Sequence, residues 1–473
     1  MQLIGRKKEL KTLNQAWKKE DAFILISGRH AVGKTAFIKT FADHKNHLYF
    51  AARSVSDQMN RLAFEQAFKQ HLNGDIKSGD NKITWEELFR LYAEKTETGG
   101  KMLIVDNFEY LLEANGDFAR TIRKAWQQFF KPNGVTLILV IGNASGKQNM
   151  MADKGFASEV TCQIALAPVT FVEMMREYPH HDFSQLMLMY AVTGGVPAYW
   201  YIFDHCINDK QVRDTIEANI LSGRGIFFDE VSRLLEREVW EPSVYHSLLS
   251  ALSADRSTQE ELAAFTGFKI GKIRDALANL ETLGYVAQTA SIGKKKLFGK
   301  QRVEYHIADP MFDFWYTFVF PYYEDIKDNR SKGAKQALKK NFAQYIQKWF
   351  RQVAGEIFLV AAAQDSLPMR TDAVGEYFDD DDNKIPIVAV DEEQKKIFFG
   401  DCVFTSEAYT KKKFDYFVEK ARGIKRLKKT YKDYTWIFGV FSAYPFEQEL
   451  LDYSLSEDNV LLFNGITIYS LNQ

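Results

Sequence analysis

The stretch that decides the fold is Gly28-Arg29-His30-Ala31-Val32-Gly33-Lys34-Thr35. It follows the apolar run 22–26 and precedes a segment, 36–42, with the apolar spacing of a helix. Strand, glycine-bracketed loop and helix with the spacing G-x-x-x-x-G-K-T define a phosphate-binding loop. The glycines let successive N–H groups converge on a phosphate, and the helix N-terminus adds partial positive charge. The motif therefore predicts nucleotide binding.

Each position of this loop has an expected role in holding ATP and Mg²⁺. Lys34 is expected to reach the terminal phosphates, and the hydroxyl of Thr35 is expected to bind Mg²⁺. The other loop positions are expected to lie against the nucleotide: Gly28, Arg29, His30, Ala31, Val32, Gly33 and Ala36.

The bulk composition predicts an ordinary globular protein with several domains. At 473 residues the chain exceeds a single core, and a prior of about 150 residues per domain predicts about three domains. A net charge of −1 argues against a wholly basic nucleic-acid binder but leaves local patches open. Cys162, Cys206 and Cys402 have no paired spacing and are interpreted as buried thiols in a reducing compartment. Without a signal core or a run near ~18 apolar residues, we expect a cytoplasmic protein without membrane contact.

A second acidic motif follows the phosphate loop. Residues 101–105 have the pattern of a buried strand that ends in Asp106, where a carboxylate is expected to orient Mg²⁺ through its water shell. In hydrolytic P-loop proteins with an inserted strand, the next residue is usually a glutamate that polarises water. Here it is Asn107, whose amide cannot accept a proton. Either hydrolysis is slow, or Glu109 replaces the missing base; the sequence leaves both open.

Two further stretches complete the predicted core. Residues 135–141 form another apolar strand pattern, and a polar residue at its tip suits a γ-phosphate sensor. We assign that role to Asn143, with Ser145 as the second candidate; a plain Gly-Asn turn explains the same residues equally well. Residues 162–168 predict the last core strand, which leads towards a helical lid. Within that lid, the stretch 193–199 (Thr-Gly-Gly-Val-Pro-Ala-Tyr) has the composition of a helix-breaking turn.

Together these motifs resemble a known family. Gly-Arg-x-x-Glu-Leu at 5–10, the phosphate loop, the apolar run ending in an aspartate and the Thr-Gly-Gly-x-Pro-x-Tyr stretch occur in the order typical of archaeal-type, AAA+-like ATPases of the STAND class, which are also found in bacteria. The resemblance covers nearly the whole chain. It implies that Gly5 and Arg6 lie near the adenine, and that Gly195 and Pro197 contact the base and ribose and couple the lid to the nucleotide state.

The chain departs from the family pattern at two places. Where the family usually has Asp-Glu, this chain has Asp106-Asn107. The family also tends to place a Gly-Arg pair before the last core strand, and the corresponding stretch 152–157 offers only Lys154. Because an arginine there would neutralise charge on the transferred phosphoryl group, both departures weaken the expectation of efficient turnover.

Residues 242–309 predict a winged helix. Three helical stripes are followed by two strand signals, and the second stripe opens with a capping box between Thr258 and Glu261. In DNA-binding versions the helix expected at 269–283 enters the major groove. Double-stranded DNA is therefore a candidate partner, and a protein-contact module with a solvated basic loop is the alternative. The prediction of DNA binding rests on eight cations of this region: Lys269, Lys272, Arg274, Lys294, Lys295, Lys296, Lys300 and Arg302. The aromatic residues of 312–318 are interpreted as core.

From about residue 335 the chain predicts an α/β domain. The family resemblance implies a restriction-endonuclease-like fold, whose active site needs an aspartate on one strand and Glu-x-Lys on the next. The corresponding positions hold Pro386 and Asp401-Cys402-Val403, so a working nuclease is not expected. The acidic run 379–382 is interpreted as a solvated loop, with cation binding as the less favoured alternative. A basic run at helical spacing is interpreted as a solvated face, with nucleic-acid contact as the alternative: Lys420, Arg422, Lys425, Arg426, Lys428, Lys429 and Lys432.

These expectations combine into an α/β architecture. A P-loop core of the inserted-strand branch occupies 1–168, a helical lid 169–235, a winged helix 236–320 and a degenerate nuclease-like domain 335–473. The predicted function is a slowly hydrolysing, ATP-dependent switch, with a protein partner or a second copy of the chain as further candidate partners. The alternatives are a DNA-binding regulator with structural ATP and, less favoured, an ATP-dependent nuclease. The residues assigned to catalysis are Lys34, Asp106, Glu109 and Asn143; those assigned to Mg²⁺ are Thr35 and Asp106.

Overall fold

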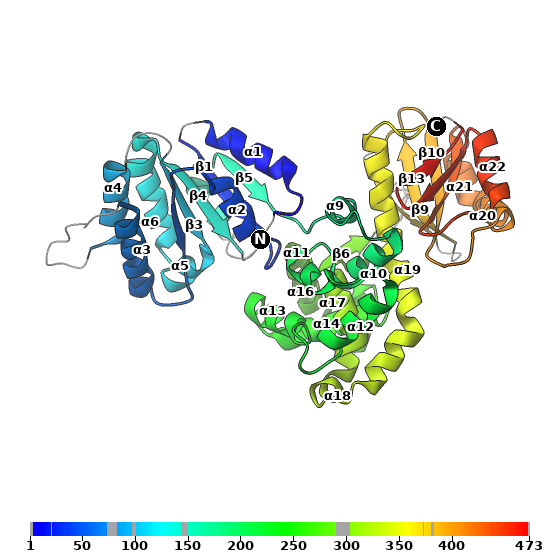
Figure 1. Cartoon of the computed structure of the whole chain (residues 1–473), viewed down its shortest axis with the longest axis horizontal. Helices are drawn as coiled ribbons and strands as arrows, with labels where there is room; N and C mark the ends of the chain where they lie inside the picture. The colour runs from blue at the N-terminus through cyan, green and yellow to red at the C-terminus, as the bar shows by residue number, and fades with distance from the viewer. Residues whose placement is uncertain are drawn as a thin grey trace. The chain divides into compact units, whose positions relative to one another are not determined.

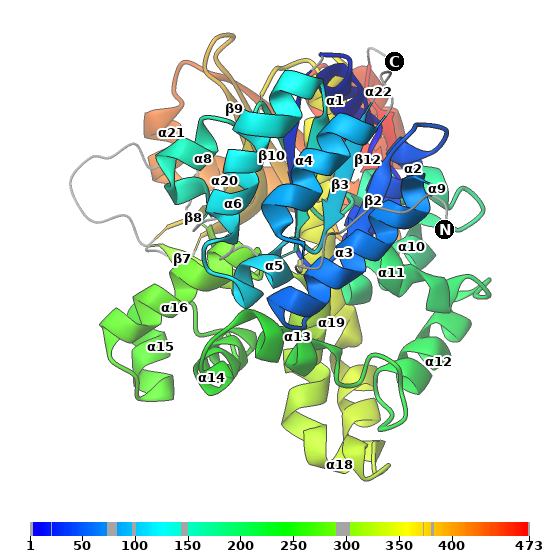
Figure 2. The same cartoon turned by 90° about the vertical axis from the view of Figure 1, so that its left-hand side faces the viewer.

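The chain forms two compact units, each with its own sheet (Figures 1 and 2). The first comprises Met1–Val169 with Val196–Ala198, and the second comprises Thr170–Gly195 with Tyr199–Gln473. The chain therefore passes from the second unit to the first and back within a few residues. The computed structural model describes residues 3–19, 21–72, 83–96, 101–142, 150–289, 303–371, 373–379 and 383–471.

The first unit is built on a five-stranded parallel sheet. Its strands are β1 (Phe23–Ser27), β2 (Leu48–Ala51), β3 (Met102–Asp106), β4 (Thr136–Ile141) and β5 (Cys162–Ala165). The order is β2-β3-β4-β1-β5, so β4 lies between β1 and β3 as the predicted inserted strand. Because all the strands are parallel, their carboxyl ends meet at one edge, where ligands of open α/β sheets bind.

Helices cover both faces of this sheet, because its fully buried strands present apolar side chains to both sides. Ile24 and Ile26 pack with α1 and α2, whereas Phe23 and Leu25 pack with α3, α4 and α6 (Figure 1). The apolar residues of α4, Trp85, Leu88, Phe89, Tyr92 and Ala93, are buried. The helices are α1 (Lys7–Trp17), α2 (Lys34–Ala42), α3 (Asp57–Leu72), α4 (Trp85–Lys95), α5 (Glu109–Ala114), α6 (Phe118–Ala125) and α8 (Lys154–Ala157).

The second unit begins with a helical region. The capping box between Thr258 and Glu261 is present, and Gly267 ends α15 with a φ of 74°. A two-stranded antiparallel hairpin, β6 (Val286–Thr289) and β7 (Glu304–Ile307), follows α16; the predicted wing cations 294–302 lie outside the described residues. The helices of this region are α9 (Phe171–Glu177), α10 (Phe183–Thr193), α11 (Pro197–Trp200), α12 (Asp209–Asn219), α13 (Glu230–Glu238), α14 (Pro242–Ser253), α15 (Gln259–Thr266), α16 (Ile270–Leu283), α17 (Pro310–Phe314) and α18 (Tyr323–Lys327).

Among the described helices, no single one is long and apolar enough to span a bilayer; one sharply bent pair, Phe183–Thr193 with Pro197–Phe203, meets that test by length and composition alone. Every side chain of α10 from Gln185 onward is buried inside the protein. The aromatic residues of 312–318 are buried as predicted.

The long helix α19 (Lys332–Ala363) ties the helical region to the C-terminal sheet. Its Lys348 and Trp349 both bind the carboxylate of Asp313 at 2.9 Å, although burial raises the pKa of that carboxyl. Its Glu356 accepts the N–H groups of Phe171 and Val172 at 3.1 and 2.7 Å. A carboxylate at these first N–H groups caps α9, which explains an acidic residue on an otherwise apolar helix face.

The C-terminal sheet has six strands in the order β13-β12-β11-β10-β9-β8. Helix α19 packs on one face, where Phe358 meets Phe398, and α20, α21 and α22 pack on the other (Figure 1). The basic run predicted at helical spacing is divided, because α20 ends at Gly423 and α21 starts at Lys425. The elements are β8 (Val374–Phe378), β9 (Lys384–Asp391), β10 (Lys396–Val403), α20 (Lys411–Gly423), α21 (Lys425–Thr430), β11 (Thr435–Ser442), α22 (Gln448–Ser456), β12 (Val460–Asn464) and β13 (Thr467–Tyr469).

Candidate nucleotide-binding site

The two glycines that bracket the loop between β1 and α2 are required by the backbone. A Cβ on Gly28 would lie 2.6 Å from the carbonyl oxygen of Leu166, closer than any side chain tolerates. Gly33 has a φ of 93°, in the left-handed region that favours glycine. Ala31 is also left-handed, with a φ of 62°. The loop therefore turns sharply directly before the N-terminus of α2, the geometry that the motif predicts.

Lys34, the first residue of α2, folds its side chain back over the loop. Its Nζ donates to the carbonyl oxygens of Gly28 and Arg29, both at 2.8 Å. Both acceptors are uncharged carbonyls of the loop itself. Exchanging them for anionic phosphate oxygens would pair the ammonium with acceptors of opposite charge, which bind it more strongly. The ammonium group therefore lies over the loop, where the motif predicts that phosphate oxygens bind.

Asp106 joins the second motif to the loop. It is only 1% exposed, at the carboxyl end of β3. Its Oδ2 accepts the hydroxyl of Thr35 at 2.9 Å and the hydroxyl of Tyr49 at 2.6 Å, while Oδ1 accepts the N–H of Asn107 at 2.9 Å. The carboxylate is therefore oriented from three sides, and the two predicted Mg²⁺ ligands are in direct contact.

Tyr49 is a site residue that sequence reasoning missed. It lies on β2, and its pKa is raised by burial and by the adjacent Asp106 carboxylate, so its hydroxyl stays protonated and donates. The available signal was weak, since a tyrosine in a strand normally indicates packing. Only the pairing of β2 with β3, which sets Ala51 opposite Asp106, brings the hydroxyl to the carboxylate.

The structure places Asn107, at the usual position of the base, and Glu109, its candidate replacement, in different surroundings. Asn107 has a φ of 55°, and its side-chain amide donates to the carbonyl of Ala52 at 3.4 Å. Glu109 turns to the edge of β4 instead, where its Oε2 accepts the N–H of Gly142 at 3.0 Å. Burial raises the pKa of Glu109, and the nearby Lys34 ammonium and the Gly142 N–H oppose that rise. Glu109, rather than Asn107, thus places a carboxylate beside Lys34.

Gly142 offers a test of this placement. A Cβ at Gly142 would lie 2.6 Å from Oε1 of Glu109 and 3.3 Å from Nζ of Lys34. We expect Gly142→Ala to displace the Glu109 carboxylate and lower ATP turnover by about 10-fold or more, with a smaller effect on ATP affinity. Phosphate release and nucleotide titration measure the two effects. The matched control is Gly116→Ala, where an added Cβ meets nothing within 4 Å; equal losses in both variants would contradict the placement.

The other residues predicted to contact the nucleotide lie in the segment before α1, in the phosphate loop and after β4. Arg6 is 4% exposed, and its guanidinium donates to the carbonyls of Val32 and Ala167, so it braces the loop. Gly5 directly precedes it, with a φ of 67°. His30 is exposed, whereas Arg29, Ala31 and Ala36 are half-buried and Val32 is buried. Asn143 and Ser145 lie outside the described residues.

The turn that contains Gly195 and Pro197 follows α10. Gly194 has a φ of 59°, and a Cβ there would lie 2.9 Å from Pro310. Its carbonyl accepts the indole N–H of Trp200 at 2.8 Å. These contacts fix the exit of α10 within the second unit, and the division between the two units falls between Gly195 and Val196.

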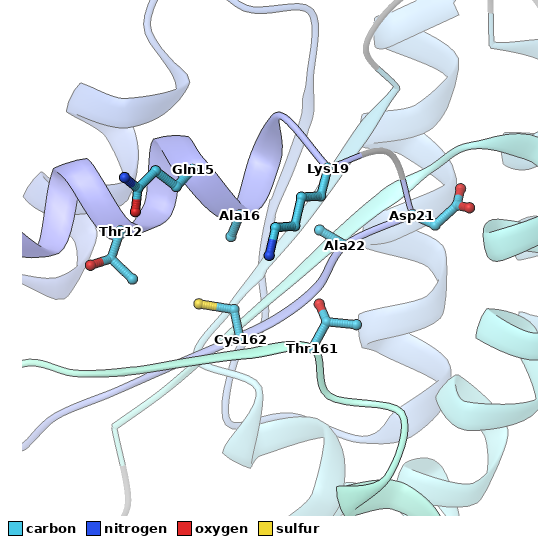
Figure 3. Close-up of a pocket in the computed structure, with 8 residues that line it drawn as sticks. All are labelled: Thr12, Gln15, Ala16, Lys19, Asp21, Ala22, Thr161 and Cys162. Atoms are coloured by element: carbon cyan, nitrogen blue, oxygen red, sulfur yellow. The ribbon is translucent and has the colours of Figure 1, made fainter.

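A recess of about 360 Å³ opens on the first unit, away from the loop (Figure 3). It is lined by the second half of α1 and by residues at the amino ends of β1 and β5, including Ala22, Thr161 and Cys162. The phosphate loop follows the carboxyl end of β1, so this recess is not part of the candidate site. Cys162 is half-buried rather than buried as predicted, whereas Cys206 and Cys402 are buried.

Comparisons with known proteins show what the chain resembles in sequence and in fold. A family model described as archaeal and bacterial proteins of unknown function matches residues 315–414. An uncharacterized protein of Methanocaldococcus jannaschii is 22% identical over 404 residues, which cover 84% of this chain and 86% of the relative. The solved Walker-type ATPase of Pyrococcus abyssi is 13% identical with a TM-score of 0.51, covering 66% of this chain and 96% of that chain. The solved ORC2 protein of Aeropyrum pernix is 12% identical with a TM-score of 0.46, and the match covers 72% of this chain and 96% of that chain.

The chain contains a P-loop NTPase fold. In such a fold, the residues present suit ATP and Mg²⁺. The Thr35 hydroxyl and the Asp106 carboxylate are hard oxygen donors in contact with each other, as Mg²⁺ prefers. Lys34 and the N-terminus of α2 supply the positive charge that a triphosphate needs.

Proposed function

We propose that the chain binds ATP with Mg²⁺, hydrolyses it slowly and acts as a nucleotide-dependent switch. The observation that carries the proposal is the convergence of Lys34, Thr35, Asp106 and Glu109 at the carboxyl edge of three neighbouring strands. A loop cation, two magnesium donors and a buried carboxylate are the parts that phosphoryl transfer to water requires. The comparison with a Walker-type ATPase supports the same fold.

Each side chain has a distinct role in the proposed reaction. Lys34 would leave the loop carbonyls for phosphate oxygens, and Thr35 with Asp106 would hold Mg²⁺. Bound Mg²⁺ neutralises the charge of the β- and γ-phosphates. Glu109 orients a water molecule and accepts its proton, which requires the deprotonated carboxylate. Tyr49 and the Asn107 N–H keep Asp106 in place. Turnover stays slow because the base lies two residues beyond the family's usual position.

The switch needs a connection between the units, and the turn from Gly195 to Pro197 supplies it. The chain leaves the second unit at Gly195, and Val196–Ala198 belong to the first unit. In this proposal the turn responds to nucleotide exchange, and α10 precedes it directly in the chain; the end of α10 is held within the second unit by Trp200 and Pro310. In this proposal the core is followed by a lid, a winged helix and a degenerate nuclease-like domain, which respond to the nucleotide.

Hydrogen exchange tests the switch. We expect non-hydrolysable ATP, compared with ADP, to slow amide exchange in α10 on the order of 10-fold, because the ordered turn restrains its local opening. Pro197→Ala should reduce this difference while ATP still binds. The control is Pro242→Ala, at the first turn of α14. If ATP binds and the exchange of α10 is the same in both nucleotide states, the chain is not a switch of this kind.

A DNA-binding regulator in which ATP is only structural is the second candidate. The order of α14, α15, α16 and the β6–β7 hairpin supports a winged helix. On α16, however, Lys272 pairs with Glu241 at 2.8 Å and Arg274 with Asp275 at 3.5 Å. An absence of any phosphate release that depends on Lys34 would favour the regulator.

An ATP-dependent nuclease has less support. The Asp401 carboxylate, the surviving acid of the nuclease pattern, accepts the hydroxyl of Tyr409 at 2.6 Å and the N–H of Cys402 at 2.9 Å. The positions of the first aspartate and of the lysine in the nuclease pattern hold Pro386 and Val403, whose side chains can neither bind a metal nor transfer a proton. Metal-dependent cutting that is lost in Asp401→Ala would revive this candidate.

A further inference from the structure

A strongly basic surface covers the solvent side of α20 and α21. Residues 420–432 contain seven cations and no carboxylate, in a chain whose net charge is −1. All seven are exposed. We call this set the cationic face: Lys420, Arg422, Lys425, Arg426, Lys428, Lys429 and Lys432.

The fold positions these cations together on one side of the two helices. The apolar stripe of α20 is buried against the sheet and continues across the break at Gly423 into α21. This stripe comprises Phe414, Phe417, Ala421, Ile424, Leu427 and Tyr431. Because it faces the core throughout, the intervening cations all remain on the outer side. Two short helices thereby present one continuous basic surface.

The cationic face differs from an ordinary solvated helix surface. On α4, Arg90 is flanked by Glu87 and Glu94, both at 3.2 Å, which is the usual arrangement of alternating charges. None of the seven cations forms an ion pair within the described part of the chain, and only Arg422 has a ring contact, with Phe438. Like charges at this density repel one another, so the surface is best suited to an external polyanion.

An exposed tyrosine extends the surface along α20. Tyr416 is 71% exposed, and its helical neighbours at spacings of four are Lys412 and Lys420. Aromatic rings beside cations stack on the bases of single strands, whereas lysines contact phosphates. Insertion into a membrane is disfavoured, because the apolar stripe of these helices is already used by the core.

From these observations we propose that the cationic face binds the phosphodiester backbone of a nucleic acid, independently of base sequence. The contact goes beyond the ATP switch and requires none of its residues. It is also separate from α16, whose cations Lys272 and Arg274 are paired with carboxylates. Charge complementarity gives the affinity, and Tyr416 favours strands with accessible bases.

Titration of the 473-residue chain with labelled DNA tests the proposal. We expect duplex affinity to fall steeply between about 50 and 200 mM salt, with a log–log slope of about −4.5 to −6.3 if about five to seven phosphates are contacted. The triple variant Lys425→Gln, Lys428→Gln, Lys429→Gln should bind about 10-fold or more weakly and reduce the slope by about 2 to 3. Tyr416→Ala should weaken the single strand about 5-fold or more while changing duplex binding little.

A matched control removes three exposed lysines from another helix of the same unit. Lys332→Gln, Lys339→Gln, Lys340→Gln on α19 changes the net charge equally and should alter affinity by less than about 2-fold. Circular dichroism verifies that both triple variants are folded. Equal losses in the two variants, salt-independent binding, or tighter binding to polyglutamate or to phosphatidylserine vesicles than to DNA would overturn the proposal. Lys34→Ala should bind DNA normally, so a failure of the ATP proposal remains distinguishable.

Discussion

Lys34→Ala is expected to weaken Mg²⁺-ATP binding by about 100-fold or more and to remove detectable phosphate release. The side chain now makes two hydrogen bonds to loop carbonyls, at 2.8 Å each. With ATP bound, the same ammonium would contact phosphate oxygens, and charge-assisted bonds of this kind contribute about 1.5–3 kcal/mol each. Losing two of them accounts for the expected loss of affinity. Nucleotide titration and a phosphate-release assay measure both effects.

The control for this variant is Lys11→Ala, an exposed lysine on α1 of the same unit. It removes the same charge without touching the loop, so ATP binding and turnover should stay near those of the unmodified protein. The thermal unfolding midpoint of Lys34→Ala should also change little, because the bonds it loses join a half-buried side chain to neighbouring carbonyls. Unchanged ATP affinity in a folded Lys34→Ala protein would refute the proposed nucleotide site.

Glu109→Gln is expected to lower turnover by about 10²- to 10⁴-fold while leaving ATP affinity within a few-fold, which is the usual effect of removing a general base. Glutamine keeps the size and can still accept the N–H of Gly142, so the geometry at the edge of β4 is retained. It cannot take a proton from water. Single-turnover hydrolysis measured alongside ATP binding separates the two effects.

Asn107→Gly is the matched control for this variant. Glycine tolerates the φ of 55° at that position, so the change removes only a side chain that contacts the Ala52 carbonyl. Turnover should change by less than about 5-fold. A larger loss in Asn107→Gly than in Glu109→Gln would assign the catalytic role to the asparagine and contradict the arrangement described.

The pH dependence of turnover should also show that Glu109 is the general base. Burial disfavours the charged carboxylate and raises the pKa of Glu109 above that of an exposed glutamate. The base acts only when deprotonated, so turnover should fall as the pH drops through this raised pKa. The fall should begin at a higher pH than it would for an exposed glutamate. The acid limb should vanish from the residual activity of Glu109→Gln. An identical profile in both proteins would exclude Glu109 as the titrating base.

Several parts of the molecule are local enough to be predicted from sequence. The phosphate loop depends on Gly28, Gly33 and Lys34, whose spacing alone fixes a turn between a strand and a helix. The core strands are continuous apolar runs, because a parallel sheet covered on both faces buries every side chain. The capping box at Thr258 is likewise a contact between residues three apart.

The structure changed the interpretation where distant segments meet. Tyr49 and Asp106 come together through the pairing of β2 with β3. Glu356 of α19 caps α9 across 185 positions of the chain. The basic run of 420–432 has the spacing of one helix, yet it is divided between α20, which ends at Gly423, and α21, which starts at Lys425. The apolar residues Ile424 and Leu427 on either side of the start of α21 are both buried in the core of the domain.

The phosphate loop, the parallel core sheet and the carboxylate at the end of β3 can all be predicted from the order of the residues, because short-range spacing encodes each of them. Which side chain lies beside Lys34 depends instead on contacts between segments that are distant in the chain. A left-handed backbone at Asn107 turns that amide to Ala52, and the neighbouring strand β4 ends at Gly142, whose N–H holds Glu109. The φ angle of Asn107 and the position of Gly142 at the end of β4 together place Glu109, and not Asn107, beside Lys34. Neither the angle nor the strand order can be predicted from residues 106–109 alone.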